Sequence, residues 1–274
     1  MSRKTVGALM VASYLMAGRL AANSAGKSTE VSTENTALSL AVCPIAYPLD
    51  ENPAQRGVHY IFYGNGFFIN RQGYLLTAAH VLSQLNQGGQ PFVLLRSKHA
   101  PPRLVKAEVI GVDTEHDVAI LRVTPNPFAG KYFDVGVLQL TTEKPVRGRQ
   151  VSAEALRPSR LKDPHSFDAP VEEKAAGEVL DYTTSELERG KGKSELFLFN
   201  HEILRGQSGA PVLMSDSGQV VGLVEGRWLH PGSVLGAGAA MPQSSTLGAA
   251  VPIHYAIELL EQKGIAWEKS AASE

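Results

Sequence analysis

The residue with the clearest chemical potential in this chain of 274 residues is a serine set between two glycines. Ser208 lies in residues 205–212 (RGQSGAPV), directly before an apolar segment. A serine hydroxyl is a weak nucleophile, so it needs an adjacent base, and the oxyanion formed by its attack on a carbonyl needs backbone N–H donors. Glycines permit the tight turn that points such donors inward. We therefore expect Ser208 to be a nucleophile, with the N–H groups of Gly206 and Ser208 as its oxyanion hole, provided that partners exist elsewhere.

A histidine and an aspartate upstream are the expected partners. His80 follows two alanines in the apolar run 74–82 (YLLTAAHVL), which fixes its orientation and lets neighbouring backbone pack close. Asp117 opens a strand too apolar to lie on a surface, so its carboxylate needs a partner, and an imidazole N–H provides one while being held in the right tautomer. Asp113 is a rival, but its Gly-Val-Asp-Thr context favours local hydrogen bonding in a turn. For His116, facing away from its neighbour Asp117, we expect no role.

Together these motifs resemble the trypsin-like serine peptidases of the chymotrypsin fold, and among them the bacterial HtrA/Deg-type branch. The resemblance rests on four segments: 66–69 (GFFI), 76–80 (LTAAH), 117–121 (DVAIL) and 206–211 (GQSGAP). Subtilisin-like and α/β-hydrolase enzymes arrange the same triad in another order along the chain. The resemblance covers roughly residues 57–264 and implies a serine endopeptidase that acts through an acyl-enzyme.

Short apolar runs separated by turns predict a β protein. With no helical periodicity between the runs, this spacing favours an antiparallel barrel or sandwich over βαβ units. The resemblance implies an all-β fold of two antiparallel six-stranded β-barrels, with His80 and Asp117 in the first and Ser208 in the second. An amphipathic helix is expected after Pro252, near the C-terminus. The strands expected in the first half of the chain are residues 58–62, 92–96, 105–112, 118–123 and 135–140.

The N-terminal residues have the outline of an export signal. Arg3 and Lys4 precede an uncharged run and then small residues, although Arg19 interrupts the pattern, and an N-terminus without signal function is the alternative. The apolar run is shorter than the ~20 residues of a membrane span. We expect a cleaved signal peptide and a periplasmic or extracellular protein. The expected organisation is a signal peptide at 1–25, a flexible leader at 26–45 and a peptidase domain at 46–270, with barrels at about 57–150 and 151–264.

Composition limits the expected partners. The net charge of −1, from 26 basic and 27 acidic residues, argues against a nucleic-acid or membrane-surface role. Cys43 is the only cysteine, so an intramolecular disulfide is excluded and a buried apolar thiol is expected. The histidines lack metal-ligand spacing, so we expect no metal and no cofactor. The expected partner is a polypeptide substrate, and homo-oligomer formation stays open.

The resemblance also implies where substrate binds. The strand after the hairpin at 215–218 would form one wall of the specificity pocket through Val224, Glu225 and Gly226, and would pair with an extended peptide. Glu202, six residues before Ser208, matches the position where trypsins place an acidic residue and would favour Lys or Arg, whereas the HtrA-like branch usually prefers small or aliphatic side chains. Segments 157–173 and 230–250 are expected to be loops. The chain has no trypsin-like activation sequence ahead of the barrel, so the site must be ordered without an ion pair to a freshly cut N-terminus.

Two other functions share these residues. A catalytically latent, protease-like module would grip extended peptides as a binding or chaperone protein without cutting them; the complete triad argues against it. An esterase of this fold would cleave small esters but not peptides. Cleavage of unfolded protein separates the endopeptidase from both alternatives, and hydrolysis of small esters separates the esterase from the latent module.

Overall fold

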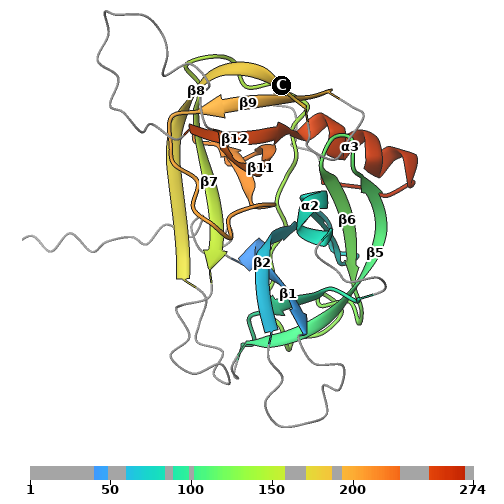
Figure 1. Ribbon diagram of the computed structural model, residues 1–274. Helices are drawn as coiled ribbons and strands as arrows, with labels where there is room; N and C mark the ends of the chain where they lie inside the picture. The colour runs from blue at the N-terminus through green and yellow to red at the C-terminus, as the bar shows by residue number, and fades with distance from the viewer. Residues whose placement is uncertain are drawn as a thin grey trace, which may run out of the picture. The chain divides into compact units, whose positions relative to one another are not determined.

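The described part of the chain folds into two closed barrels of six antiparallel strands, which confirms the predicted all-β architecture (Figure 1). The computed structural model describes residues 40–48, 60–83, 89–98, 102–157, 171–186, 193–228 and 247–268. The predicted signal peptide, most of the predicted leader and most of the two predicted loops lie outside these residues. No helix within the described residues is long and apolar enough to cross a membrane.

The first barrel has the strand order β1-β2-β3-β6-β5-β4. It begins earlier than predicted, because β1 occupies residues that we had assigned partly to the leader and that precede the predicted barrel start at 57. This short apolar strand pairs with both β2 and β4 and so closes the barrel. Cys43 is buried within it, and burial raises the pKa of its thiol to about 12, so it is no nucleophile. The strands are β1 (Val42–Pro48), β2 (Tyr60–Phe68), β3 (Tyr74–Thr77), β4 (Phe92–Leu95), β5 (Arg103–Asp113) and β6 (Val118–Val123).

The second barrel has the order β10-β11-β12-β9-β8-β7. The predicted C-terminal helix is present as α3 (Ile253–Gln262), and the short helix α2 (Ala79–Leu82) begins just before His80. The end of the predicted loop 230–250 is instead the start of β12. The strands are β7 (Gln150–Arg157), β8 (Val171–Glu186), β9 (Lys193–Phe199), β10 (Pro211–Met214), β11 (Val220–Trp228) and β12 (Leu247–Pro252).

The predicted strand at residues 135–140 is wrong. This segment connects the barrels, and its backbone bonds pass from the first barrel to the second along its length. The Leu138 N–H donates to the carbonyl of Phe68 in β2 (2.9 Å), whereas Leu140 forms an isolated bridge with Val220 in β11. Because this apolar segment bonds to both barrels, it has the composition of a strand but no continuous row of hydrogen bonds to one neighbouring strand.

Each barrel has its own buried apolar cluster, and a third cluster spans both barrels. A single cluster of buried side chains joins Phe67 and Ile120 of the first barrel to Leu213 and Leu223 of the second, and α3 packs into the same cluster. Burial of such side chains stabilises the fold by about 1.5–3 kcal/mol each. The relative position of the barrels is therefore fixed by packing, and residues that face one another across their junction can form a precise site.

Candidate active site

His80 and Asp117 form a directly bonded pair in the first barrel. The Nδ1 atom of His80 lies 2.7 Å from Oδ2 of Asp117, and the His80 backbone N–H donates to Oδ1 at 2.7 Å. The Asp117 carbonyl accepts a third bond, from the N–H of Ala79 (3.1 Å). The Asp117 side chain is only 5% exposed, whereas that of His80 is 39% exposed. The carboxylate thus orients the imidazole from beneath and leaves its other edge open to a substrate.

The backbone at Asp117 is unusual. Its φ is +56°, and among the described residues other than glycine it alone has a positive φ. Asp and Asn tolerate this left-handed region better than most residues. The conformation folds the residue back at the end of the β5–β6 turn, so that both carboxylate oxygens face the start of α2.

The charges around His80 favour its protonated form. Burial alone would lower the pKa of His80, but the hydrogen bond and negative charge of Asp117 and the charge of Glu225 outweigh it and raise that pKa above its ordinary value. A base with a raised pKa is well matched to accept a proton from a serine hydroxyl near neutral pH.

The serine turn lies against the strand end that leads to His80. A Cβ added at Gly209 would lie 2.3 Å from the carbonyl oxygen of Asn65 and 3.0 Å from the nitrogen of Ala78, so only glycine allows this approach. All three predicted triad residues therefore lie at the junction of the barrels. In this structure the Ser208 hydroxyl donates to the main-chain carbonyl of Glu225 (3.3 Å), and no hydrogen bond joins it to His80 within the described residues.

The predicted oxyanion donors lie on the same turn. Gly206 has a φ of +94°, a conformation that glycine adopts without penalty. Within the described part of the chain, the N–H groups of Gly206 and Ser208 donate to no protein acceptor. An oxyanion hole requires two such N–H donors close together, and here they belong to residues separated by Gln207.

Buried Asn65 ties the serine turn to both barrels. Its side-chain NH₂ donates to the carbonyl of Gly206 (2.8 Å), and its side-chain oxygen accepts the N–H of Leu156 in β7 (2.9 Å). Its backbone N–H donates to the carbonyl of Ser208 (2.7 Å), and its carbonyl accepts the hydroxyl of Thr77 (2.7 Å). Asn65 is 0% exposed, so water cannot replace these bonds. Sequence reasoning missed this role of Asn65.

A second buried amide, Gln207, holds the turn from inside. Its side-chain oxygen accepts the N–H of Leu204 (2.6 Å), and its NH₂ donates to Glu173 of β8 (3.3 Å). Gln207 is only 2% exposed. The neutral side chains of Asn65 and Gln207 thus hold the serine turn in place. They take the part that an ion pair to a cut N-terminus has in trypsins.

The predicted pocket wall is part of β11. The backbone of Val224 exchanges hydrogen bonds with the serine turn: its carbonyl accepts from Gly209 (2.8 Å) and its N–H donates to Ala210 (2.9 Å). Glu225 is the extra residue of a bulge in the pairing with β12, and a side chain added at Gly226 would meet open space. The wall therefore adjoins Ser208 through backbone contacts.

Glu202 has a cationic neighbour that the sequence did not reveal. Its carboxylate lies 3.7 Å from Nη1 of Arg227, whose Nε–H donates to the carbonyl of Ile203 (2.6 Å). The Glu202 side chain is 53% exposed. A Lys or Arg side chain of a substrate would thus compete with Arg227 for the Glu202 carboxylate. The role of Glu202 in specificity stays a prediction. Within the described residues, no three His, Cys, Asp or Glu side chains group as metal ligands.

Replacing Glu225 with glutamine is expected to move the acid limb of kcat/KM to lower pH. In the expected triad His80 must be neutral to act as the base, so activity should rise as pH rises through the pKa of His80. The ionised Glu225 carboxylate raises that pKa, and the amide of Glu225→Gln would not, so His80 would lose its proton at lower pH. The measurement is a pH–rate profile of both proteins, with Glu154→Gln as control. An unchanged acid limb in Glu225→Gln would mean that Glu225 does not act on His80.

Solved structures of similar fold share little sequence with this chain. The active form of the Rv3671c protease from M. tuberculosis is 18% identical, with 85% of each chain covered and a TM-score of 0.55. The HtrA-type protease AlgW, solved with a decapeptide, is 18% identical over 85% of this chain and 67% of its own, with a TM-score of 0.55. Deg5 is 20% identical over 84% of this chain and 94% of its own, with a TM-score of 0.54. At such identities the likeness shows the fold alone.

The sequence, unlike the fold alone, identifies the family. No curated protein sequence matches the chain. A family profile for the trypsin-like peptidase domain matches residues 64–223, which is more than half of the chain and includes His80, Asp117 and Ser208. The chain therefore belongs to the family of trypsin-like peptidases.

Proposed function

We propose that this protein is a serine endopeptidase whose triad is Ser208, His80 and Asp117. The observation that carries the proposal is the bonded His80–Asp117 pair beside a serine turn whose Gly206 and Ser208 N–H groups donate to no acceptor among the residues that the structure describes. A base oriented by a buried carboxylate, a nucleophile and an oxyanion hole are the parts that acyl transfer requires.

The proposed reaction proceeds in two halves. Ser208 exchanges its bond to the Glu225 carbonyl for one to Nε2 of His80, gives its proton to that nitrogen and attacks the peptide carbonyl. Asp117 holds the Nδ1–H and stabilises the imidazolium, while the N–H groups of Gly206 and Ser208 bind the oxyanion. His80 then protonates the leaving amine, and water, activated by the same base, releases the acyl group.

The proposed substrate is an unfolded or extended polypeptide. Residues 226–228 of β11 pair with β12 on one side, whereas the ladder with β10 runs only from Leu223 to Val220. Beyond Leu223, no strand of the described residues pairs with the other side of β11. An extended peptide can add there by main-chain bonds, which requires a segment free of its own secondary structure. This substrate class is also the one expected from the HtrA-type resemblance.

The alternative is a latent module that binds peptides without cutting them. One observation favours it: the Ser208 hydroxyl is engaged by the Glu225 carbonyl and makes no bond to His80 within the described residues. Serine–base bonds are often formed only in the complex with substrate, so the endopeptidase remains the better-supported function.

The test is digestion of unfolded casein by the wild-type protein and by Ser208→Ala. We expect casein fragments with the wild type, none with the variant, and slower cleavage of a compact folded protein. Casein that binds but stays intact would support the latent module. Hydrolysis of a small ester without casein cleavage would support the esterase.

We also propose that the protein is exported. The proposal rests only on the sequence pattern of residues 1–25, which lie outside the described residues. Mass spectrometry of the mature protein from its native host tests it, because cleavage near Ala22 would shorten the chain by a defined mass.

A further inference from the structure

A second His–Asp pair lies directly beside the catalytic one, in the turn that carries Asp117. Oδ1 of Asp113 accepts the backbone N–H groups of Glu115 and His116, both at 3.0 Å. Oδ2 of Asp113 lies 2.7 Å from Nδ1 of the His116 ring. The carboxylate therefore fixes both the backbone and the side chain of the residue that precedes Asp117.

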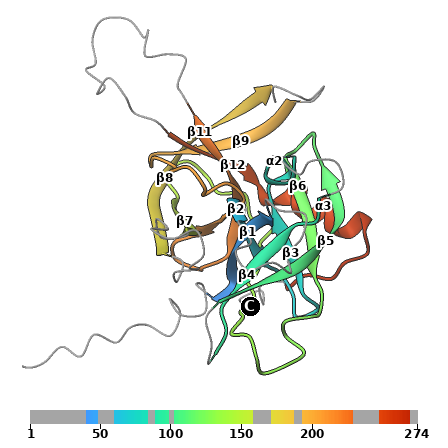
Figure 2. The same cartoon turned by 60° about the horizontal axis from the view of Figure 1, so that its bottom comes forward.

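The His116 ring is in turn stacked on the C-terminal helix. Its centroid lies 3.9 Å from that of Tyr255 in α3, with the rings inclined by only 15°. On the same helix, the ring of His254 lies 4.0 Å from that of Tyr255, centroid to centroid. Helix α3 lies beside β5 and β6 of the first barrel (Figure 2). The stack joins the β5–β6 turn of the first barrel to α3.

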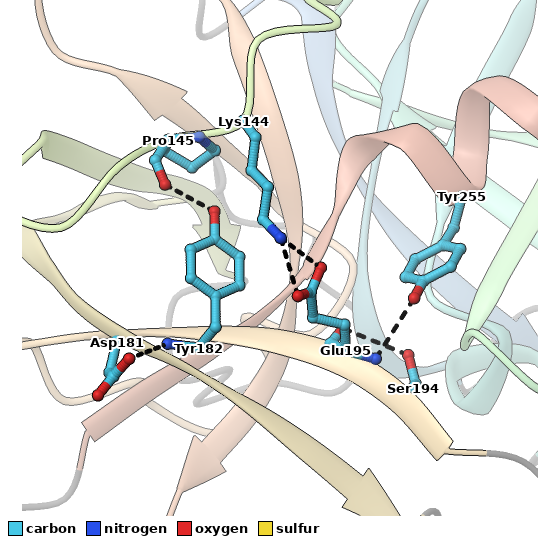
Figure 3. Close-up of polar contacts among 7 residues, drawn as sticks. All are labelled: Lys144, Pro145, Asp181, Tyr182, Ser194, Glu195 and Tyr255. Atoms are coloured by element: carbon cyan, nitrogen blue, oxygen red, sulfur yellow. Dashed lines mark hydrogen bonds and ion pairs between the residues drawn. The ribbon is translucent and has the colours of Figure 1, made fainter.

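Tyr255 is anchored in the second barrel at its other end. Its hydroxyl accepts the backbone N–H of Glu195 in β9 (3.4 Å), and the Glu195 carboxylate binds Nζ of Lys144 through both oxygens (2.8 Å each) (Figure 3). Lys144 belongs to the segment that connects the barrels, and it also lies over the ring of Tyr182 (4.1 Å). The ring on which His116 rests is thus bonded to β9, and the Glu195 side chain of that strand is paired with the connecting segment.

We propose that His116 and Tyr255 are positioning residues that hold Asp117 in its catalytic orientation. This inference rests on the proposed function, since it concerns the carboxylate that orients the catalytic base. The left-handed backbone at Asp117 is sparsely populated and persists only where the surroundings over-determine it. The Asp113–His116–Tyr255 contacts provide that constraint from the residue adjacent to Asp117.

The titratable groups around the stack come from several elements. Asp113 faces His116 from the end of β5, and His254 faces it from α3. Glu258, Glu195 and Lys144 act electrostatically on His254, whose pKa burial lowers below its ordinary value. The positioning effect is therefore measured on the titration of His80 itself, compared between variants that all keep Asp113, His254, Glu258, Glu195 and Lys144.

The test compares two tyrosines that flank the same Lys144–Glu195 pair. Tyr255→Leu removes the ring beneath His116, whereas Tyr182→Leu removes a ring of equal size that contacts Lys144 but not the catalytic turn. We expect Tyr255→Leu to lower kcat by about 10- to 100-fold with little change in KM, because small misplacements of catalytic groups have effects of this size. His116→Leu is expected to match it, and the double variant to be no worse than either single one. Tyr182→Leu is expected to keep the wild-type kcat.

An NMR titration of His80 in the same variants makes the test independent of peptidase activity. A loosened Asp117 would hold the imidazolium less well, so the pKa of His80 should fall in Tyr255→Leu and His116→Leu but not in Tyr182→Leu. A folded Tyr255→Leu protein with unchanged kcat and unchanged His80 titration would overturn the inference. If the wild type cleaves no peptide, the proposed function fails, and the His80 titration still decides the positioning role.

Discussion

Replacing Asp117 with asparagine is expected to lower kcat for peptide cleavage by about 10⁴-fold. The wild-type carboxylate accepts two bonds from His80, one from Nδ1 and one from the backbone N–H, both at 2.7 Å. An asparagine in the same place would present an NH₂ donor to the ring and favour the tautomer whose proton lies on Nε2. That nitrogen could then not accept the proton of Ser208.

Steady-state kinetics on an unfolded protein substrate measure this effect, with KM expected to change little because Asp117 is buried away from the bound peptide. The control is Asp216→Asn, which alters an exposed aspartate in the β10–β11 hairpin that pairs with Arg149 (2.9 Å). An Asp117→Asn protein with more than about a tenth of the wild-type kcat would show that His80 is oriented by something else.

Replacing Asn65 with alanine is expected to lower kcat strongly, though less than replacing Asp117. The variant leaves the buried N–H of Leu156 without its side-chain partner, at about 1–3 kcal/mol, and removes the partly buried bond to the carbonyl of Gly206. The Gly206 peptide would also lose the bond that fixes its orientation. Loss of one oxyanion donor costs about 10²–10³-fold in kcat, and we expect a decrease of that order.

Asn70→Ala is the matched control for this variant. Asn70 is also a nearly buried amide of the first barrel, and it bonds to the carbonyl of Ala266 (2.6 Å) and to the N–H of Gln72 (3.0 Å). Chemical denaturation should show both variants destabilised, whereas kcat should fall only in Asn65→Ala. Equal losses of kcat in the two variants would reduce the role of Asn65 to general stability.

Local sequence patterns were enough to predict much of the fold and part of the candidate site. The histidine, aspartate and serine motifs carried the resemblance to the trypsin-like peptidases, and that resemblance implied the two-barrel fold. The turn around Asp113 was also predictable, since Asp before Thr favours hydrogen bonds to its own backbone neighbours, as its bonds to Glu115 and His116 show. These features depend on residues close together in the chain.

The features that the sequence did not reveal depend on contacts between distant segments. Asn65 bonds to Gly206, 141 residues away, and His116 meets Tyr255 only because α3 packs beside the β5–β6 turn. β1 was assigned in part to a leader because its pairing with β2 and β4 has no local signal. The electrostatic interaction of Glu225 in β11 with Asp117 and His80 likewise joins residues that are far apart in the sequence.

The most direct test of the proposed chemistry is intact-protein mass spectrometry after treatment with a fluorophosphonate, which reacts with activated serines. The account predicts a single adduct, located on Ser208, in the wild type and none in Ser208→Ala or in His80→Ala. A folded wild-type protein that acquires no adduct, or one that is modified equally after loss of His80, would contradict a triad at this site.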